Sequence, residues 1–169
     1  MKERWRARQE LVERALQAEL DRTDVLDDTL RQAMAYSLMA GGKRLRPVLL
    51  MAAADAVGAD GAKFLSVACA LEMIHTYSLI HDDLPAMDND DYRRGKLTNH
   101  KVFGDGIAIL AGDGLLTLAF TVILRQQDVS ADTLLRVVDE ISRAAGAEGM
   151  VGGQVLDLRA EEHRISMEE

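Results

Sequence analysis

The chemistry of this chain is concentrated in a cluster of carboxylates at residues 80–95, which read IHDDLPAMDNDDYRRG. The aspartates of the cluster are Asp82, Asp83, Asp88, Asp90 and Asp91. Side chains of like charge this close repel one another unless a cation joins them. Carboxylate oxygens suit Mg²⁺, which commonly bridges to the phosphates of a substrate. The cluster therefore indicates a magnesium site that acts on phosphorylated molecules.

Arg93 and Arg94 follow the aspartates directly. A planar guanidinium binds phosphate oxygens through two parallel hydrogen bonds, so this pair suits the same phosphates. Asp82 and Asp88 are six residues apart and would point to different faces of an unbroken helix. Pro85 interrupts a regular helix, and a bulge at this residue would bring Asp88 back towards Asp82.

A solvated acidic loop with two chance arginines is the alternative interpretation of this stretch. The apolar run at 64–80, which precedes the aspartates and has the pattern of a buried helix, weakens that alternative. A calcium-binding EF-hand fits poorly. Counted from Asp88, its sixth position is Arg93 rather than glycine, and its twelfth is Asn99 rather than glutamate.

A second charged block, GGKRLRP at 41–47, is basic. Lys43 and Arg46 are three residues apart, so they share a face if a helix starts here. Helix N-termini bind anions through free N–H groups and the helix dipole. The block therefore predicts a phosphate pocket. A solvated basic turn is the alternative, and it would be favoured if the block stood alone.

Other polar residues on apolar elements are ambiguous. His75 lies about two turns before Asp82, and its pattern is that of a satisfied core residue. Ser78 lies on the Asp82 face of the expected helix, and Tyr77 lies beside it. Gln154 follows paired glycines, which permit the close approach of a second helix or a ligand; a helix–helix hydrogen bond and a role in the site are both open.

The elements that must position these residues are helical. Alanine, leucine and methionine are plentiful and aromatic residues make up only 4% of the chain, which favours helix over sheet. Apolar periodicity and capping residues predict helices over 2–21, 25–40, 46–57, 62–85, 105–125 and 131–145. Residues 88–104 are expected to form a loop.

Composition excludes several classes of protein. The 169 residues form one domain or a piece of one, and the net charge of −8 argues against nucleic acid as the main partner. Cys69 lies in an apolar run and is expected to be a buried core thiol, which fits a reducing cytoplasm. The N-terminal residues are too charged for a secretory signal.

Two further segments bear on the organisation of the chain. Residues 106–124 are apolar over nearly the length of a membrane span, but Asp113 interrupts them, so we expect a buried bundle helix and no stable membrane insertion. Residues 166–169, SMEE, have the form of a capping box that begins a helix. This ending suggests that the polypeptide is cut short.

Four ordered blocks together resemble the trans-isoprenyl diphosphate synthases. They lie at 41–47, 72–95, 111–120 and 149–158. The four residues between the Asp pair and Asp88 are similar to the bacterial farnesyl diphosphate synthase branch. The resemblance implies that 1–169 is the N-terminal part of a single all-α domain. In the family this domain is a bundle of long helices around a deep cavity, usually as a homodimer.

The resemblance also implies roles for individual residues. Asp82 and Asp88, with Asp83 in support, would hold Mg²⁺ against an allylic diphosphate, which Arg93 would also contact. The diphosphate of isopentenyl diphosphate would be bound by Lys43, Arg46, His75 and Arg94. Gln154 is a further candidate for substrate contact, and Tyr77 and Ser78 are candidates for control of product length.

The chain departs from the family pattern in one respect. Members carry a second Asp-rich motif on a later helix and a lysine–threonine pair between the two motifs, and neither occurs in this sequence. We therefore expect this chain to be weakly active or inactive alone. Exposed apolar helix faces would favour association, including exchange of helices between chains.

Two other functions remain in competition with prenyl transfer. One is a non-catalytic subunit that binds prenyl diphosphates and regulates a partner. The other is a class I terpene cyclase. The basic block at 41–47 speaks against a cyclase, which has no second diphosphate substrate to hold.

Overall fold

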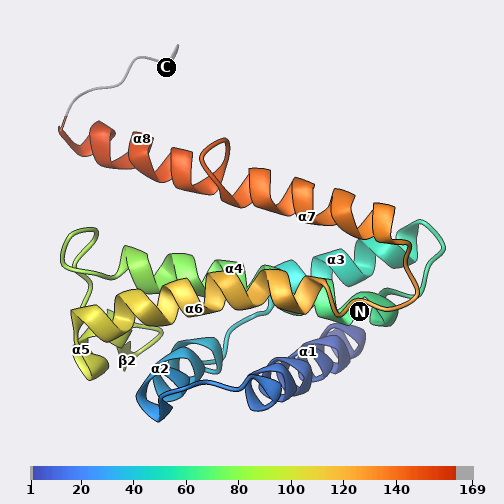
Figure 1. Cartoon of the computed structure of the whole chain (residues 1–169), viewed down its shortest axis with the longest axis horizontal. Helices are drawn as coiled ribbons and strands as arrows, with labels where there is room; N and C mark the ends of the chain where they lie inside the picture. The colour runs from blue at the N-terminus through green and yellow to red at the C-terminus, as the bar shows by residue number, and fades with distance from the viewer. Residues whose placement is uncertain (1, 163–169) are drawn as a thin grey trace. The chain divides into compact units, whose positions relative to one another are not determined.

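The computed structural model of the chain describes residues 2–162 and is built from helices, which confirms the all-α prediction (Figure 1). The chain divides into two compact units, Met1–Asp128 and Val129–Glu169, and each is described here by itself. The capping box predicted at 166–169 lies outside the described residues.

The first unit contains most of the secondary structure. Its elements are α1 (Lys2–Arg22), α2 (Asp28–Leu38), α3 (Leu45–Ala56), the 3₁₀ turn η1 (Gly61–Phe64), α4 (Leu65–Asp82), the strands β1 (Tyr92–Arg93) and β2 (Lys96–Leu97), α5 (Asn99–Phe103) and α6 (Asp105–Ile123). The second unit contains α7 (Ala131–Ala145) and α8 (Met150–Glu162).

Three sequence predictions of local structure were wrong in detail. The helix predicted from residue 25 begins at Asp28, because the carboxylate of Asp27 accepts a 2.7 Å hydrogen bond from the N–H of Thr29 and caps the helix there. The helix predicted over 62–85 ends at Asp82, before Pro85. The predicted loop at 88–104 contains the β1–β2 hairpin and α5.

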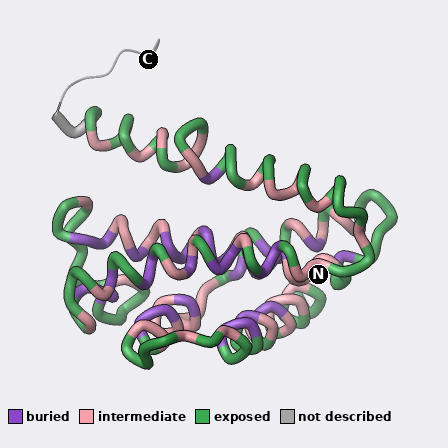
Figure 2. The backbone as a smooth tube through the Cα atoms, in the orientation of Figure 1, coloured by how far each residue is buried: buried purple, intermediate pink, exposed green. Residues whose placement is uncertain are grey.

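Helices α4 and α6 pack against each other and form the core of the first unit, with α1, α2 and α3 around them. In Figure 2 the buried residues run along both helices, and they include Met73 and Ile80 on α4 and Leu115 on α6. Cys69 is also buried, as predicted, and burial raises the pKa of its thiol to about 12.

Among residues 2–162, two helical stretches are long and apolar enough to cross a membrane: Gly61–Asp82 and Asp105–Ile123. Within the chain, 56% and 44% of their most apolar windows are buried. Because the two stretches pack on each other, a helical core accounts for their composition. The prediction of a buried bundle helix at 106–124 agrees with this packing.

Helices α4 and α6 approach each other closely at Gly112, where a Cβ would overlap the ring of His81. The His81 Nε2 donates a 3.0 Å hydrogen bond to the carbonyl of Ile109 and lies 3.8 Å from a carboxylate oxygen of Asp113. These contacts fasten the end of α4, next to the aspartates, to α6.

Replacing Gly112 with alanine should lower the free energy of unfolding by about 1–3 kcal/mol through overpacking, offset in part by the roughly 1 kcal/mol that alanine gains over glycine in a helix. Urea unfolding measures the change. Gly114→Ala is the matched control, since a Cβ there meets only the flexible side chain of Met34. Equal stability of the two variants would show that the close contact between Gly112 and His81 does not restrict the size of the residue at position 112.

Candidate functional site

Predicted site residues occupy the accessible side of α4. His75, Ser78 and Asp82 are half-buried on a helix that is otherwise mostly buried between Val67 and Ile80. Their spacing of three and four residues places them on one side of the helix. Tyr77 is 5% exposed and lies beside this side rather than on it, with its ring 5.7 Å from the His81 ring.

The chain turns back on itself after α4. The N–H of Asp88 donates a 2.9 Å hydrogen bond to the carbonyl of Asp82, and the N–H of Asn89 donates one of 3.1 Å to Leu84. The turn contains Pro85, where the sequence predicts a bulge. The backbone of Asp88 is therefore held next to that of Asp82, although six residues separate them.

Asp83 has a different environment from the neighbouring aspartates. It is 3% exposed, and its Oδ1 accepts a 2.7 Å hydrogen bond from Nε of Arg93 and lies 2.6 Å from Nη2 of the same side chain. The hydrogen bond that Arg93 donates to Asp83 raises the pKa of Arg93, and burial of the guanidinium opposes the shift. Asp83 thus holds Arg93 in place beside the end of α4.

The magnesium prediction rests on Asp82, Asp83 and Asp88, and the structure does not gather the three carboxylates. Within residues 2–162 no group of three or more His, Cys, Asp or Glu side chains is close enough to hold a metal ion. Mg²⁺ keeps several waters and is often bound through one or two carboxylates together with substrate phosphates. Asp82 and the exposed Asp88 fit that mode of binding.

The β1–β2 hairpin carries the two predicted phosphate-binding arginines. Tyr92 pairs with Leu97 and Arg93 with Lys96, and the turn residues Arg94 and Gly95 have φ angles of 53° and 77°. These positive angles are typical of a two-residue hairpin turn. The turn directs Arg94 to the carbonyl of Gly41, which accepts a hydrogen bond from its Nη1. The hairpin thereby links the acidic stretch to the basic block.

The basic block lies at a helix N-terminus, as predicted. Helix α3 begins at Leu45, so Lys43 precedes the helix and Arg46 lies in its first turn. Both side chains belong to exposed residues. Arg44, between them, is buried, although nothing in the local sequence distinguishes it from the other two cations.

Positive charges from separate segments act on His75. Burial lowers the pKa of His75, and the positive charge of Arg46 lowers it further. Arg94 and Arg93 act in the same direction, while Glu72 opposes them. Arg46 on α3 and Arg93 and Arg94 of the hairpin therefore lie near enough to the half-buried imidazole for their charges to affect its pKa. This cationic cluster suits an anion with several oxygens.

We expect His75 to titrate below the ordinary histidine value of 6.5 in the free protein. Between the lowered pKa and 6.5 the unfolded chain binds more protons, so this group makes stability fall as the pH drops through that window. Bound diphosphate should raise the His75 pKa by adding negative charge. An NMR titration of the ring protons measures both, with His75→Asn to identify the resonance. A His75 pKa that does not respond to diphosphate would place the anion elsewhere.

Gln154 belongs to the second unit, on α8, and is half-buried. The structure does not relate Gln154 to the residues of the first unit. The helix–helix contact and the site role proposed for Gln154 from the sequence both stay predictions.

Comparison with known proteins defines the class to which this fold and this charge arrangement belong. The polyprenyl synthetase family matches residues 27–169, and the chain belongs to that family. The crystal structure of a geranyltransferase from Legionella pneumophila superposes with a TM-score of 0.89 at 40% identity, over 98% of this chain and 58% of that one.

Two curated relatives show how much of a synthase sequence this chain matches. The chain is 53% identical over 164 residues to the farnesyl diphosphate synthase of Bacillus subtilis (strain 168), covering 96% of this chain and 55% of the relative. It is 52% identical over 155 residues to the heterodimeric geranylgeranyl pyrophosphate synthase large subunit 1 of Arabidopsis thaliana, covering 90% of this chain and 41% of the relative. The chain thus spans about half the length of the curated relatives it matches.

Proposed function

We propose that the protein acts in prenyl transfer. The reaction condenses isopentenyl diphosphate with an allylic diphosphate, dimethylallyl or geranyl, to give farnesyl diphosphate and release diphosphate. One observation carries the proposal: a cationic cluster around His75 lies on the same side of α4 as Asp82, which the turn holds next to Asp88. Two neighbouring subsites of this kind match two diphosphate substrates.

The allylic diphosphate belongs to the acidic subsite. Asp82 and Asp88 would hold Mg²⁺, which when bound supplies positive charge against the diphosphate that leaves. Arg93 contacts the same diphosphate from the hairpin. Asp83 supports this subsite through its hydrogen bond with Arg93, which fixes the guanidinium before the substrate arrives. Preorganised cations stabilise the departing anion and thereby favour ionisation of the allylic C–O bond.

Isopentenyl diphosphate belongs to the cationic cluster. Its diphosphate is bound by Lys43, Arg46, His75 and Arg94. The double bond of this substrate attacks the allylic carbon, and a proton is then lost. Apolar side chains around the reacting carbons exclude water and protect the carbocation from hydrolysis.

Product length is proposed to depend on Tyr77 and Ser78. Tyr77 lies about 7–8 Å from Asp82 along the helix at the usual rise per residue, and its buried ring is a candidate floor for a C15 chain. Tyr77→Ala should shift the products towards more than fifteen carbons, measured by chromatography after dephosphorylation. Tyr77→Phe is the matched control and should keep the C15 product. If Tyr77→Ala leaves the lengths unchanged, the floor is another residue.

The proposal also covers the location, the oligomeric state and the ligands of the protein. It places the chain in the cytoplasm, in a homodimer, with small-molecule prenyl diphosphates as ligands and without stable membrane insertion or nucleic-acid binding. The core packing of α4 and α6 supports the absence of stable membrane insertion, and the net charge of −8 argues against nucleic acid as a partner.

Turnover with labelled isopentenyl diphosphate tests the proposed function. With geranyl diphosphate and Mg²⁺ present, a prenyltransferase transfers the label to farnesyl diphosphate. A regulatory subunit binds the label without forming product. A terpene cyclase ignores the label and consumes the allylic diphosphate alone. Either of these last two results would overturn the proposal.

A further inference from the structure

The basic block contains a cation that faces the protein interior. Lys43 and Arg46 are exposed, whereas the Arg44 side chain is 1% exposed. A buried arginine needs partners for its charge and for its five N–H donors. Those partners come from three segments far apart in the sequence.

Two carboxylates and a carbonyl satisfy Arg44. Its Nε and Nη2 donate to the two oxygens of Glu13 at 2.7 and 3.1 Å, and its Nη1 donates to Oε1 of Glu72 at 2.9 Å. Its Nη2 also donates to the carbonyl of Leu38 at 2.8 Å. Arg44 therefore ties the block to α1, to α4 and to the end of α2.

The backbone around Arg44 has an uncommon conformation. Arg44 is in the left-handed region, with φ 47° and ψ 43°, which is unfavourable for a residue with a Cβ. Gly41 and Gly42 precede it with φ angles of 83° and 139°. The Arg44 side chain holds this bend, and the bend sets the directions of the exposed side chains on either side of it.

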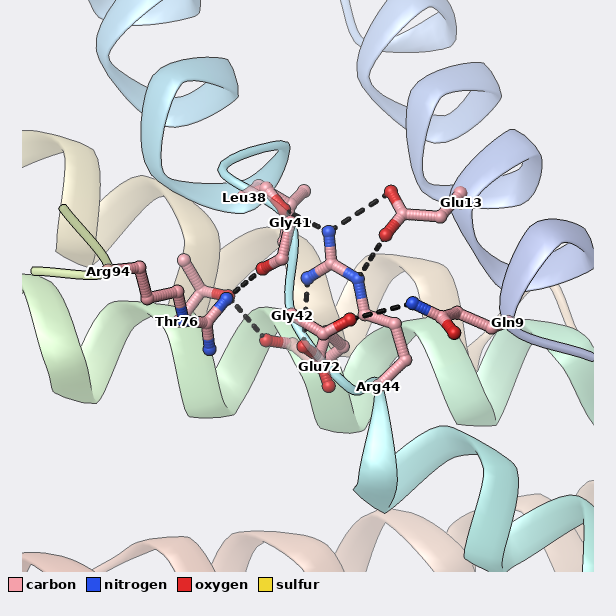
Figure 3. A network of polar contacts seen from close by, with 9 residues as sticks. All are labelled: Gln9, Glu13, Leu38, Gly41, Gly42, Arg44, Glu72, Thr76 and Arg94. Atoms are coloured by element: carbon pink, nitrogen blue, oxygen red, sulfur yellow. Dashed lines mark hydrogen bonds and ion pairs between the residues drawn. The ribbon is translucent and has the colours of Figure 1, made fainter. Parts of the chain in front are cut away.

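The same bend is hydrogen-bonded to another residue that is proposed to bind isopentenyl diphosphate. The carbonyl of Gly41 accepts a hydrogen bond from Arg94, and that of Gly42 accepts one of 2.8 Å from Gln9 (Figure 3). Glu72, the partner of Arg44 on α4, lies one turn before His75, which belongs to the cationic cluster. The Arg44 contacts thus reach α4 directly, and the hairpin meets the same bend through the hydrogen bond between Arg94 and Gly41.

We propose that Arg44 is a positioning residue for the cationic cluster: it does not touch the diphosphate, but it fixes Lys43, Arg46 and, through Gly41, Arg94 in the arrangement that binds it. This inference rests on the proposed function of that cluster. It assigns Glu13 and Glu72 to the same task, as the carboxylates that hold Arg44.

Binding of inorganic diphosphate to the 169-residue chain, measured by calorimetry in EDTA, tests the proposal. Arg44→Lys keeps the charge but cannot reproduce the branched set of hydrogen bonds, so we expect binding about tenfold weaker. Arg46→Ala removes a side chain that is proposed to contact the diphosphate directly, so this variant should also bind diphosphate more weakly. Arg125→Gln is the matched control: it removes a half-buried pair with Glu19 outside the cluster and should leave the affinity unchanged.

Glu13→Ala separates positioning from simple charge, because the two effects have opposite signs. Removing a nearby negative charge should by itself strengthen diphosphate binding. Loss of positioning should weaken it several-fold, although Arg44 keeps Glu72 and the Leu38 carbonyl. Circular dichroism at the assay temperature verifies that each variant is folded.

Weaker binding by both Arg44→Lys and Glu13→Ala supports the inference. Unchanged binding in Arg44→Lys, or tighter binding in Glu13→Ala, overturns it while the proposed site stands. If the unmodified chain does not bind diphosphate, or Arg46→Ala binds as well as the unmodified chain, the proposed site itself is wrong and the inference falls with it.

Discussion

Replacing Arg44 with methionine is expected to lower the free energy of unfolding by about 3–5 kcal/mol. The reason is the carboxylate that remains. Glu72 is 2% exposed, and Arg44 is its ion-pair partner at 2.9 Å. A buried charge without its partner destabilises the folded chain by more than the net stabilisation that the pair had given. The side chain of Glu13 is 29% exposed, so water can solvate its carboxylate when Arg44 is absent. The buried Glu72 therefore accounts for most of the loss of stability.

Denaturant unfolding followed by circular dichroism measures this loss, and a double variant controls it. Arg44→Met combined with Glu72→Met removes both charges and should recover most of the stability, because an apolar pair of similar volume fills the same space. If the double variant is as unstable as the single one, lost packing rather than an unpaired charge accounts for the loss.

We expect Mg²⁺ to strengthen the binding of an allylic diphosphate to the protein about a hundredfold. Replacing both Asp82 and Asp88 with asparagine is expected to abolish this gain in affinity. Asparagine preserves the size of each side chain but removes the negative charge that attracts the metal ion. The backbone hydrogen bond between these two residues is unaffected, so the turn should persist. Calorimetry with a non-reactive thio analogue of geranyl diphosphate, with and without Mg²⁺, measures the effect.

Asp91→Asn provides the matched control for that pair. Asp91 belongs to the same acidic stretch, but its carboxylate lies 2.7 Å from the Lys101 ammonium group and is 58% exposed. Its replacement should leave the magnesium-dependent gain in affinity unchanged. An equal loss in Asp91→Asn would mean that the total charge of the stretch, rather than Asp82 and Asp88, attracts the metal ion.

Local pattern was sufficient to predict the helical fold and one feature of the candidate site. Apolar periodicity and the paired glycines predicted the order of the helices. The inability of Pro85 to continue a regular helix predicted the turn that holds Asp88 next to Asp82. These features depend on interactions within a few residues of one another, which is the range that sequence periodicity and turn propensity describe.

The contacts that sequence reasoning missed are long-range. Arg44 reads as a third cation in a basic block, and its burial depends on carboxylates 31 residues before it and 28 residues after it. Asp83 looks equivalent to Asp82, and only the folded hairpin shows that Arg93 is its partner. His75 has the pattern of a core residue, and the resemblance to the synthase family, rather than any local pattern, assigned it to the site with Arg46 and Arg94, whose charges lower its pKa in the folded chain.

The hairpin arginines have protein partners before any ligand arrives, with consequences for the kinetics of association. Arg93 is held by Asp83, and Arg94 by the carbonyl of Gly41. A diphosphate that binds as proposed must share these donors or displace their partners, so its capture should proceed in two stages, an electrostatic encounter followed by an exchange of hydrogen bonds. Salt should slow the first stage strongly and the second only weakly. At high ligand concentration the observed rate should therefore level off at the rate of the exchange.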